Sequence, residues 1–133
     1  MENKTEVKQV SEREIRIGDN KYYLDEGNIF YITAVGKYNE KEAIEAKEIT
    51  LRFLNLIKGK VDISIDLNKA GKQSPEARKI WKELSELKKV GKIALFGLHP
   101  VARILAVFVM GVTRKKDMRF FRTKEEALAW LKY

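Results

Sequence analysis

Hydrophobic and polar positions repeat along the chain with two different periods, and these periods predict its strands and helices. Short alternating or β-branched runs bounded by Gly, Asn and Asp predict strands, whereas apolar residues three and four apart predict helices. The predicted strands are 13–18, 21–24, 29–35, 61–67, 92–97 and 118–121. The predicted helices are 39–58, 75–87, 100–112 and 123–131, with Leu56 on the buried side of the first.

The order of these elements predicts an α/β fold. The first strands are separated by short turns, which is typical of an antiparallel meander. Strands and helices then alternate, and such crossovers require largely parallel neighbours and a right-handed connection. We therefore expect a mixed, mostly parallel sheet with an N-terminal antiparallel meander and four main helices. Residues 13–133 form one domain in this interpretation, and the polar residues 1–12 form a flexible N-terminal segment.

Two helix starts are marked by capping residues. Thr123 with Glu126 is a capping box, in which each side chain satisfies a backbone N–H at the helix start. Ser74 followed by Pro75 is a second signal, because proline suits the first helical position and serine suits the position before it.

The helix 100–112 is apolar nearly all round, with Arg103 as its one charged residue. The expected core side is Val101, Ile104, Leu105, Phe108 and Val112. The opposite side is Ala102, Ala106, Val107, Val109 and Met110. Either both sides are covered, or one side is exposed for a partner or an apolar ligand. If one side is exposed for a partner, the simplest partner is a second copy of the chain, which would form a homodimer through this helix.

Charge and composition narrow the function classes. The 27 Lys and Arg exceed the 19 Asp and Glu, which gives a formal charge of +8 and favours acidic partners. The dense basic runs 88–92 and 114–116 lie at helix ends, where the helix dipole explains them, so nucleic-acid binding rests on net charge alone. The absence of cysteine excludes disulfides and zinc–cysteine sites.

Two further observations bear on the cellular location of the protein. The first residues lack the apolar stretch of a signal peptide, so we expect a cytoplasmic protein. The apolar segment 93–112 is interrupted by Gly97, Pro100 and Arg103, so we expect no membrane span.

Candidate chemistry is sparse. His99 is the only histidine, and a capping or exposed role competes with a ligand-binding one. Asp66 follows a strand pattern and could point into a cleft, although aspartates there also form turns. A triad of Ser74, His99 and Asp66 lacks the Gly-x-Ser-x-Gly context of a nucleophile. We expect no enzymatic activity, no metal and no cofactor.

Three segments, 61–67, 73–78 and 120–131, resemble the SpoIIAA-like branch of the STAS superfamily. The resemblance implies a right-handed β–α superhelix and a regulatory module. In the anti-sigma-factor antagonists of this superfamily a serine at the start of the corresponding helix is phosphorylated, and Ser74 matches it by position. The chain departs from their Asp-Ser-Ser-Gly loop, since Gln73 and Pro75 flank the serine, and helix capping alone also explains Ser74.

We therefore expect a non-enzymatic binding or regulatory module that acts through protein–protein interaction. The candidate partner or ligand surface is Asp66, His99, Arg103, Ala106 and Met110. The alternative is a carrier or sensor of a small apolar, lipid-like ligand, because the CRAL-TRIO lipid carriers have a similar β–α arrangement. Its pocket would be lined by Trp81, Ala106, Phe108 and Met110. Nucleic-acid binding is the third hypothesis.

Overall fold

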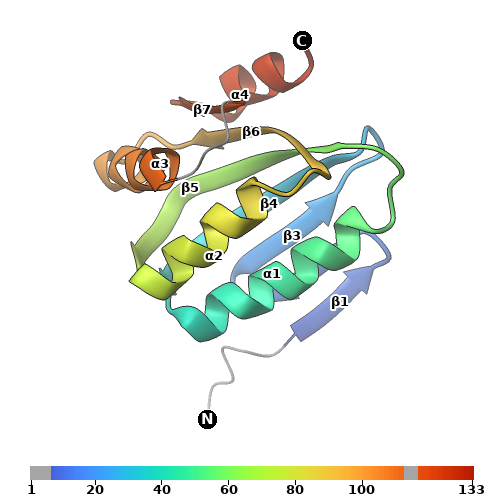
Figure 1. Cartoon of the computed structure of the whole chain (residues 1–133), viewed down its shortest axis with the longest axis horizontal. Coiled ribbons are helices and arrows are strands. Elements are labelled where there is room, and N and C mark those ends of the chain that lie inside the picture. Colours follow the sequence, from blue (N-terminus) through green and yellow to red (C-terminus); the bar gives the residue numbers. More distant parts are fainter. Residues whose placement is uncertain (1–6, 113–116) are drawn as a thin grey trace.

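A computed structural model describes residues 7–112 and 117–133, without the side chains of Phe108 and Val112 (Figure 1). In these ranges one sheet contains seven strands that lie side by side in their order along the chain. The strands are β1 (Val7–Ser11), β2 (Glu14–Ile17), β3 (Asn20–Leu24), β4 (Ile29–Tyr38), β5 (Val61–Gln73), β6 (Val90–Phe96) and β7 (Met118–Phe121). The helices are α1 (Glu40–Leu54), α2 (Pro75–Ser85), α3 (Pro100–Val112) and α4 (Lys124–Leu131).

The strand directions confirm the predicted mixed sheet. β1 to β4 pair antiparallel through short turns, and β4 to β7 pair parallel. Each parallel connection contains a helix, as the alternating pattern requires. The predicted α/β class, the opening meander and the four helices are thus all confirmed within the described ranges.

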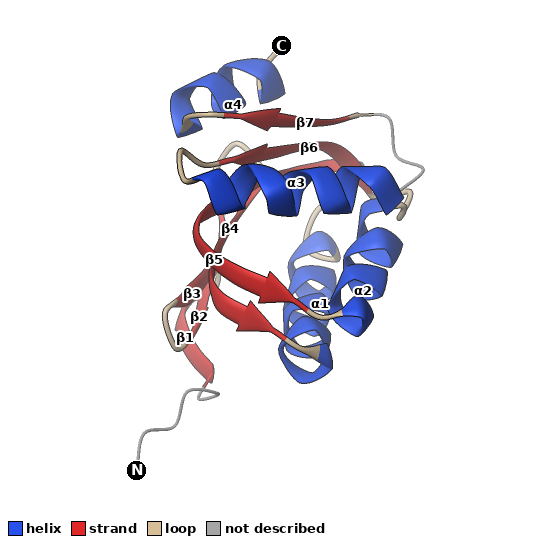
Figure 2. Cartoon of the chain, turned by 90° about the vertical axis from the view of Figure 1, so that its left-hand side faces the viewer, coloured by secondary structure: helices blue, strands red, loops and turns tan. Residues whose placement is uncertain are grey.

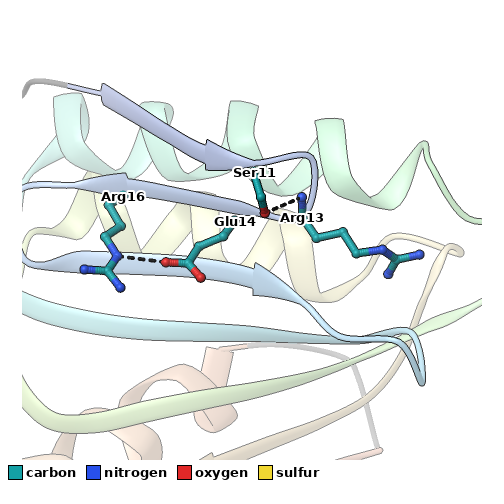
Figure 3. Close-up of polar contacts among 4 residues, drawn as sticks. All are labelled: Ser11, Arg13, Glu14 and Arg16. Atoms are coloured by element: carbon teal, nitrogen blue, oxygen red, sulfur yellow. Dashed lines mark hydrogen bonds and ion pairs between the residues drawn. The ribbon is translucent and has the colours of Figure 1, made fainter.

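The first strand, β1, was not predicted, because residues 7–11 were assigned to a flexible segment. All five of its residues are exposed, so the strand has no buried side to produce an alternating pattern. Its hairpin with β2 carries polar contacts, which Figure 3 shows. Glu14 Oε2 lies 2.8 Å from Arg16 Nε, and Ser11 Oγ accepts a hydrogen bond from the Arg13 N–H at 3.1 Å. Residues 1–6 lie outside the described ranges.

Several element ends differ from the prediction, most clearly those of β4, β5 and α1. β5 continues six residues beyond Leu67, because the partner strand β4 also extends and pairs Gly36 with Ala70. Here the backbones approach closely: a Cβ on Gly71 would lie 3.0 Å from the carbonyl carbon of Gly36. α1 ends at Leu54, earlier than predicted, which leaves Leu56 59% exposed.

The two faces of the sheet are covered unequally. α1, α2 and α3 contribute to one large apolar core on the first face, which contains Phe30, Phe53 and Leu95. α4 packs on the opposite face in a smaller cluster with Ile29 and Phe96. Figure 2 shows α1 and α2 together on one side of the sheet and α4 beside β7. This division leaves part of the α4 face of the sheet without a helix.

The orientation of α3 differs from the prediction. Ala102 and Ala106 are fully buried, whereas the predicted core residues Val101 and Ile104 are 39% and 55% exposed. Leu105 is buried in the main core as predicted, so the helix is rotated and not reversed. Close packing at its start explains the rotation, because a Cβ on Gly97 would lie 2.5 Å from the Ala102 Cβ. The predicted core positions Phe108 and Val112 have side chains outside the description.

Candidate functional site

Exposed large apolar side chains gather on the outer side of α3 and at Leu98, just before this helix. Ile104 and Val107 lie about one turn apart at its centre and are 55% and 62% exposed. We call this surface the α3 patch, and it consists of Leu98, Val101, Ile104, Val107 and Met110. Exposed apolar surface of this kind marks interaction sites more often than it serves stability. The patch shares only Met110 with the predicted partner surface, and that a partner binds here stays a prediction.

The structure exposes some of the predicted surface residues on and near α3 and buries another. Arg103 and Met110 are exposed, and Met110 belongs to the α3 patch. Ala106 is fully buried in the main core, so its assignment to the surface was wrong. His99 is exposed, and its Nδ1 accepts a hydrogen bond from the Val101 N–H at 3.2 Å, which is a helix-start contact. The capping alternative thus accounts for His99.

Asp66 supports the loop that leads into α3. Its Oδ1 accepts hydrogen bonds from the Asn68 backbone N–H and from Asn68 Nδ2, both at 2.9 Å. Asn68 Oδ1 in turn accepts one from the Leu98 N–H at 2.9 Å. The chain of contacts fixes the end of β6 relative to β5, and it places Leu98 at the edge of the α3 patch.

Ser74 is the N-cap of α2, as predicted. Its Oγ accepts a hydrogen bond from the Ala77 N–H at 3.1 Å, and its own N–H donates to Tyr38 O at 2.9 Å. The preceding residue, Gln73, is buried and accepts a hydrogen bond from Trp81 Nε1 at 2.8 Å. The serine is half-buried, and capping fully explains its position. Phosphorylation of Ser74 stays a prediction.

An apolar cavity of about 80 Å³ lies between the sheet and the helices α1, α2 and α3. Its lining includes Trp81, as predicted for an apolar pocket, but neither Ala106 nor Met110. A cavity of about 150 Å³ is known to hold benzene, so this one has about half the room of a benzene site. A lipid-sized molecule would fit only if α3 moved away from the sheet.

A second, larger hollow lies on the opposite face of the sheet beside the start of α4. We call it the α4-face cleft; its volume is about 360 Å³. Two neighbouring rows of side chains cross the strands on this face. The first row is Tyr23, Tyr31, Ser64 and Ala94, and the second is Lys21, Thr33, Asp66 and Phe96. Seven of these eight residues line the cleft, and Ala94 does not. The rest of the lining is Asp25, Ile32 and Lys124 of α4.

Aromatic rings and lysines are paired in this cleft. The Tyr23 and Tyr31 rings stack with centroids 5.9 Å apart. Lys21 Nζ lies 5.5 Å from the Tyr23 ring centroid, and Lys124 Nζ lies 5.4 Å from that of Tyr31. Burial, followed by the hydrogen bond to Asp25, raises the pKa of Tyr31 to about 12. Its hydroxyl therefore stays protonated near neutral pH and donates to Asp25 Oδ2 at 2.9 Å.

Ser64 also lines the cleft, although the sequence analysis did not identify it as a site residue. The residue is 1% exposed, and among the described residues its Oγ is the one buried side-chain polar atom without a hydrogen-bond partner. Asp62, Ser64 and Asp66 alternate with buried apolar residues, which was a signal that this side of β5 is polar. The neighbours that form the cleft come from strands far away in the sequence, and no local pattern identifies them.

The structure separates the residues of the hypothetical triad. Asp66 lies within β5 and Ser74 follows the end of the same strand, eight residues later. Extended chain of that length spans roughly 25 Å, so one substrate could not contact both side chains. Among residues 7–112 and 117–133 no group of three or more His, Asp or Glu side chains could hold a metal ion. Over the same ranges no helix has the length and apolar character needed to cross a membrane.

The strand order, the unequal faces and the capped helices together define an α/β domain of the STAS type. The SpoIIAA-like family model matches residues 29–132, and the chain belongs to that family. The match begins at β4 and thus leaves out most of the antiparallel meander. The predicted resemblance is confirmed.

Two solved structures show the same fold. One is an uncharacterised DUF3478-family protein with a SpoIIAA-like fold from Shewanella loihica PV-4, at 19% identity and a TM-score of 0.61 over 95% of this chain and 90% of that one. The other is the anti-sigma factor antagonist SpoIIAA in its unphosphorylated form, at 13% identity and a TM-score of 0.56 over 85% and 97%. A search of curated proteins found no significant match.

Proposed function

We propose that this chain is a regulatory module without catalytic activity that binds another protein through the α3 patch. The observation that carries the proposal is the exposure of Ile104 and Val107 at the centre of an apolar helix side. Leaving such side chains in water forgoes roughly 1.5–3 kcal/mol each relative to burial. A fold shared with an anti-sigma factor antagonist supports a protein as the partner.

Charge favours an acidic partner over a second copy of the chain. Arg103 is the single charged residue of α3, and the sequence that follows this helix includes Arg114, Lys115 and Lys116. The whole chain has a formal charge of +8, so two copies repel each other whereas an acidic protein is attracted. The partner surface should therefore combine an apolar centre with an acidic rim.

Photo-crosslinking in the native host tests this proposal. A benzophenone amino acid replaces Val107 in the α3 patch, and in a matched control it replaces the exposed Glu48 of α1. Position 107 should yield an adduct with one acidic protein that position 48 does not yield. The adduct should disappear with Ile104→Glu and persist with Ile44→Glu, an equivalent change at an exposed isoleucine of α1.

Three results would contradict the proposal. They are the absence of any adduct from position 107, the same adducts from both positions, and an adduct that is a second copy of this chain. Sedimentation velocity across a concentration series checks the last result independently. A dimer that Ile104→Glu dissociates would assign the α3 patch to self-association instead.

A second candidate function, binding of a small apolar ligand, is supported by the cavity beneath α3. Its volume of about 80 Å³ suits a ligand of only a few heavy atoms while α3 keeps its position. Native mass spectrometry of the purified protein tests this candidate. A co-purified lipid would show that α3 moves to admit it, and a ligand-free mass would count against the carrier function.

A further inference from the structure

We propose that the α4-face cleft is a binding site for a small molecule that carries a carboxylate or phosphate group. Lys21 and Lys124 would attract the anionic group, and the hydroxyl of Ser64 would donate a hydrogen bond to it. The cleft lies across the sheet from α3, so this site is separate from the proposed partner surface.

The unpartnered hydroxyl of Ser64 is the first argument. Buried polar atoms in folded proteins are nearly always hydrogen-bonded, and an exception calls for an explanation. Ser64 is 1% exposed, its Oγ has no partner, and the residue lines the cleft. Alanine would fill the same position without the unsatisfied group. A ligand oxygen in the cleft would supply the missing acceptor.

The charges around the cleft are the second argument. Each of its two carboxylates already accepts hydrogen bonds: Asp25 from the Ile29 N–H and the Tyr31 hydroxyl, and Asp66 from Asn68. The two ammonium groups, in contrast, contact only aromatic rings and have no ion pair within the described ranges. The lining is formally neutral, because Lys21 and Lys124 balance Asp25 and Asp66, but within the described ranges the two ammonium groups are its charged groups without a hydrogen-bond or ion-pair partner. The donors that remain available to a ligand in the cleft are therefore cationic.

The side chains that line the cleft and its volume indicate what the ligand carries besides its anionic group. The stacked rings of Tyr23 and Tyr31, with Phe96 in the neighbouring row, offer flat apolar surface beside the lysines. A volume of about 360 Å³ lies within the roughly 300–1,000 Å³ range of small-molecule sites. A planar ring with one attached anionic group matches this combination of surfaces.

The test is a titration of the ¹⁵N-labelled full chain with sodium benzoate, phenyl phosphate and phenol, followed by amide chemical shifts. Benzoate, phenyl phosphate or both should produce saturable shifts at Thr33, Ser64 and Lys124, and the tighter of the two identifies the anionic group. Phenol has the ring without the charge and should bind at least tenfold more weakly. The absence of saturable shifts with both anions at millimolar concentration would overturn the proposal.

Charge-matched variants separate a specific site from general attraction to a basic protein. Lys21→Gln combined with Lys124→Gln should weaken anion binding at least tenfold. Lys41→Gln combined with Lys58→Gln removes the same charge from exposed positions elsewhere and should leave the affinity unchanged. Equal weakening in both pairs would reduce the observation to nonspecific electrostatics and would overturn the proposal.

The variant Ser64→Ala tests the hydroxyl itself by two opposite effects. Removing an unsatisfied polar atom should raise the Tm by ~4 °C. Losing a hydrogen bond to a charged ligand should weaken binding ~10-fold. A raised Tm with unchanged affinity would contradict the role of Ser64 in the site.

Discussion

The two faces of the sheet use the same strands for different purposes. On the face covered by α1, α2 and α3, the side chains of Phe30, Phe53 and Leu95 are buried in one large core. On the α4 face, alternate positions of the same strands carry tyrosine, serine, threonine and aspartate around an open cleft. Because strand residues alternate between faces, one face can stabilise the fold while the other leaves room for a ligand.

This difference between the two faces indicates where a binding surface can lie without a loss of folding stability. Packing within the domain does not account for the α3 patch or for the α4-face cleft. Both surfaces lie beside the parts of the sheet that helices cover. The α3 patch is the outer side of a core helix, and the cleft is the uncovered part of the smaller face. Changes in either should affect binding more than folding, whereas changes in the main core should do the opposite.

The largest expected effect comes from the covered face. Phe53→Ala removes a ring that is 1% exposed and packs against Phe30 at a centroid distance of 5.3 Å. It should lower the free energy of unfolding by ~3–5 kcal/mol. Thr33→Ala, in the cleft, should lower it by less than ~1 kcal/mol. Urea denaturation of both variants measures the contrast, and similar losses would show that the two faces contribute equally to stability.

A smaller effect is expected from a pair of buried tyrosines on the covered face. The Tyr22 and Tyr38 hydroxyls lie 3.1 Å apart, and burial raises the pKa of Tyr22 to about 12. Above pH 10 the unfolded chain releases the Tyr22 proton while the folded protein keeps it, so the folded state loses stability as pH rises towards 12. This loss amounts to ~3 kcal/mol for Tyr22.

The measurement is the free energy of unfolding at pH 9 and pH 12 for the wild type and for Tyr22→Phe. The phenylalanine variant should show a smaller decrease, because it has no hydroxyl to titrate at this position. Tyr31→Phe, in the cleft, should change the decrease less, since Tyr31 is more exposed than Tyr22. Identical pH dependence in Tyr22→Phe and the wild type would contradict the assigned cause.

A still smaller effect is expected at the cap of α2. Ser74→Ala removes the hydrogen bond to the Ala77 N–H and should cost ~1 kcal/mol of stability. Ser74→Asp should restore most of this loss, because aspartate is an equally good N-cap. Mass spectrometry of the protein from its native host separately tests phosphorylation. A Ser74→Ala variant with unchanged stability would remove the capping explanation and strengthen the regulatory one.

Local sequence signals predicted the fold well, because they act over a few residues. The capping box of Thr123 and Glu126 is present, with the Glu126 N–H donating to Thr123 Oγ1 at 3.2 Å. Asn39 and Glu42 form a second capping box at the start of α1. Helix starts and strand order could be predicted for this reason. β1 could not, since a fully exposed edge strand carries no hydrophobic pattern.

The candidate sites depended on packing that no local signal encodes. In α3 both sides are apolar, so periodicity could not decide which one faces the sheet, and the contact between Gly97 and Ala102 decided it. The α4-face cleft joins residues from β3, β4, β5, β6 and α4, and among them only Asp66 had been selected. Ser64 could not be recognised, because the absence of a hydrogen-bond partner is a property of its three-dimensional surroundings.

The most direct test of the central claim is the affinity of the acidic partner, once it is captured and purified, for matched variants. Isothermal titration calorimetry should show at least tenfold weaker binding to Ile104→Glu than to the wild type, and no change for Ile44→Glu. Both variants should keep the wild-type Tm within ~2 °C, because both side chains are exposed. Equal affinity of the partner for Ile104→Glu and the wild type would contradict the assignment of the α3 patch as its binding surface.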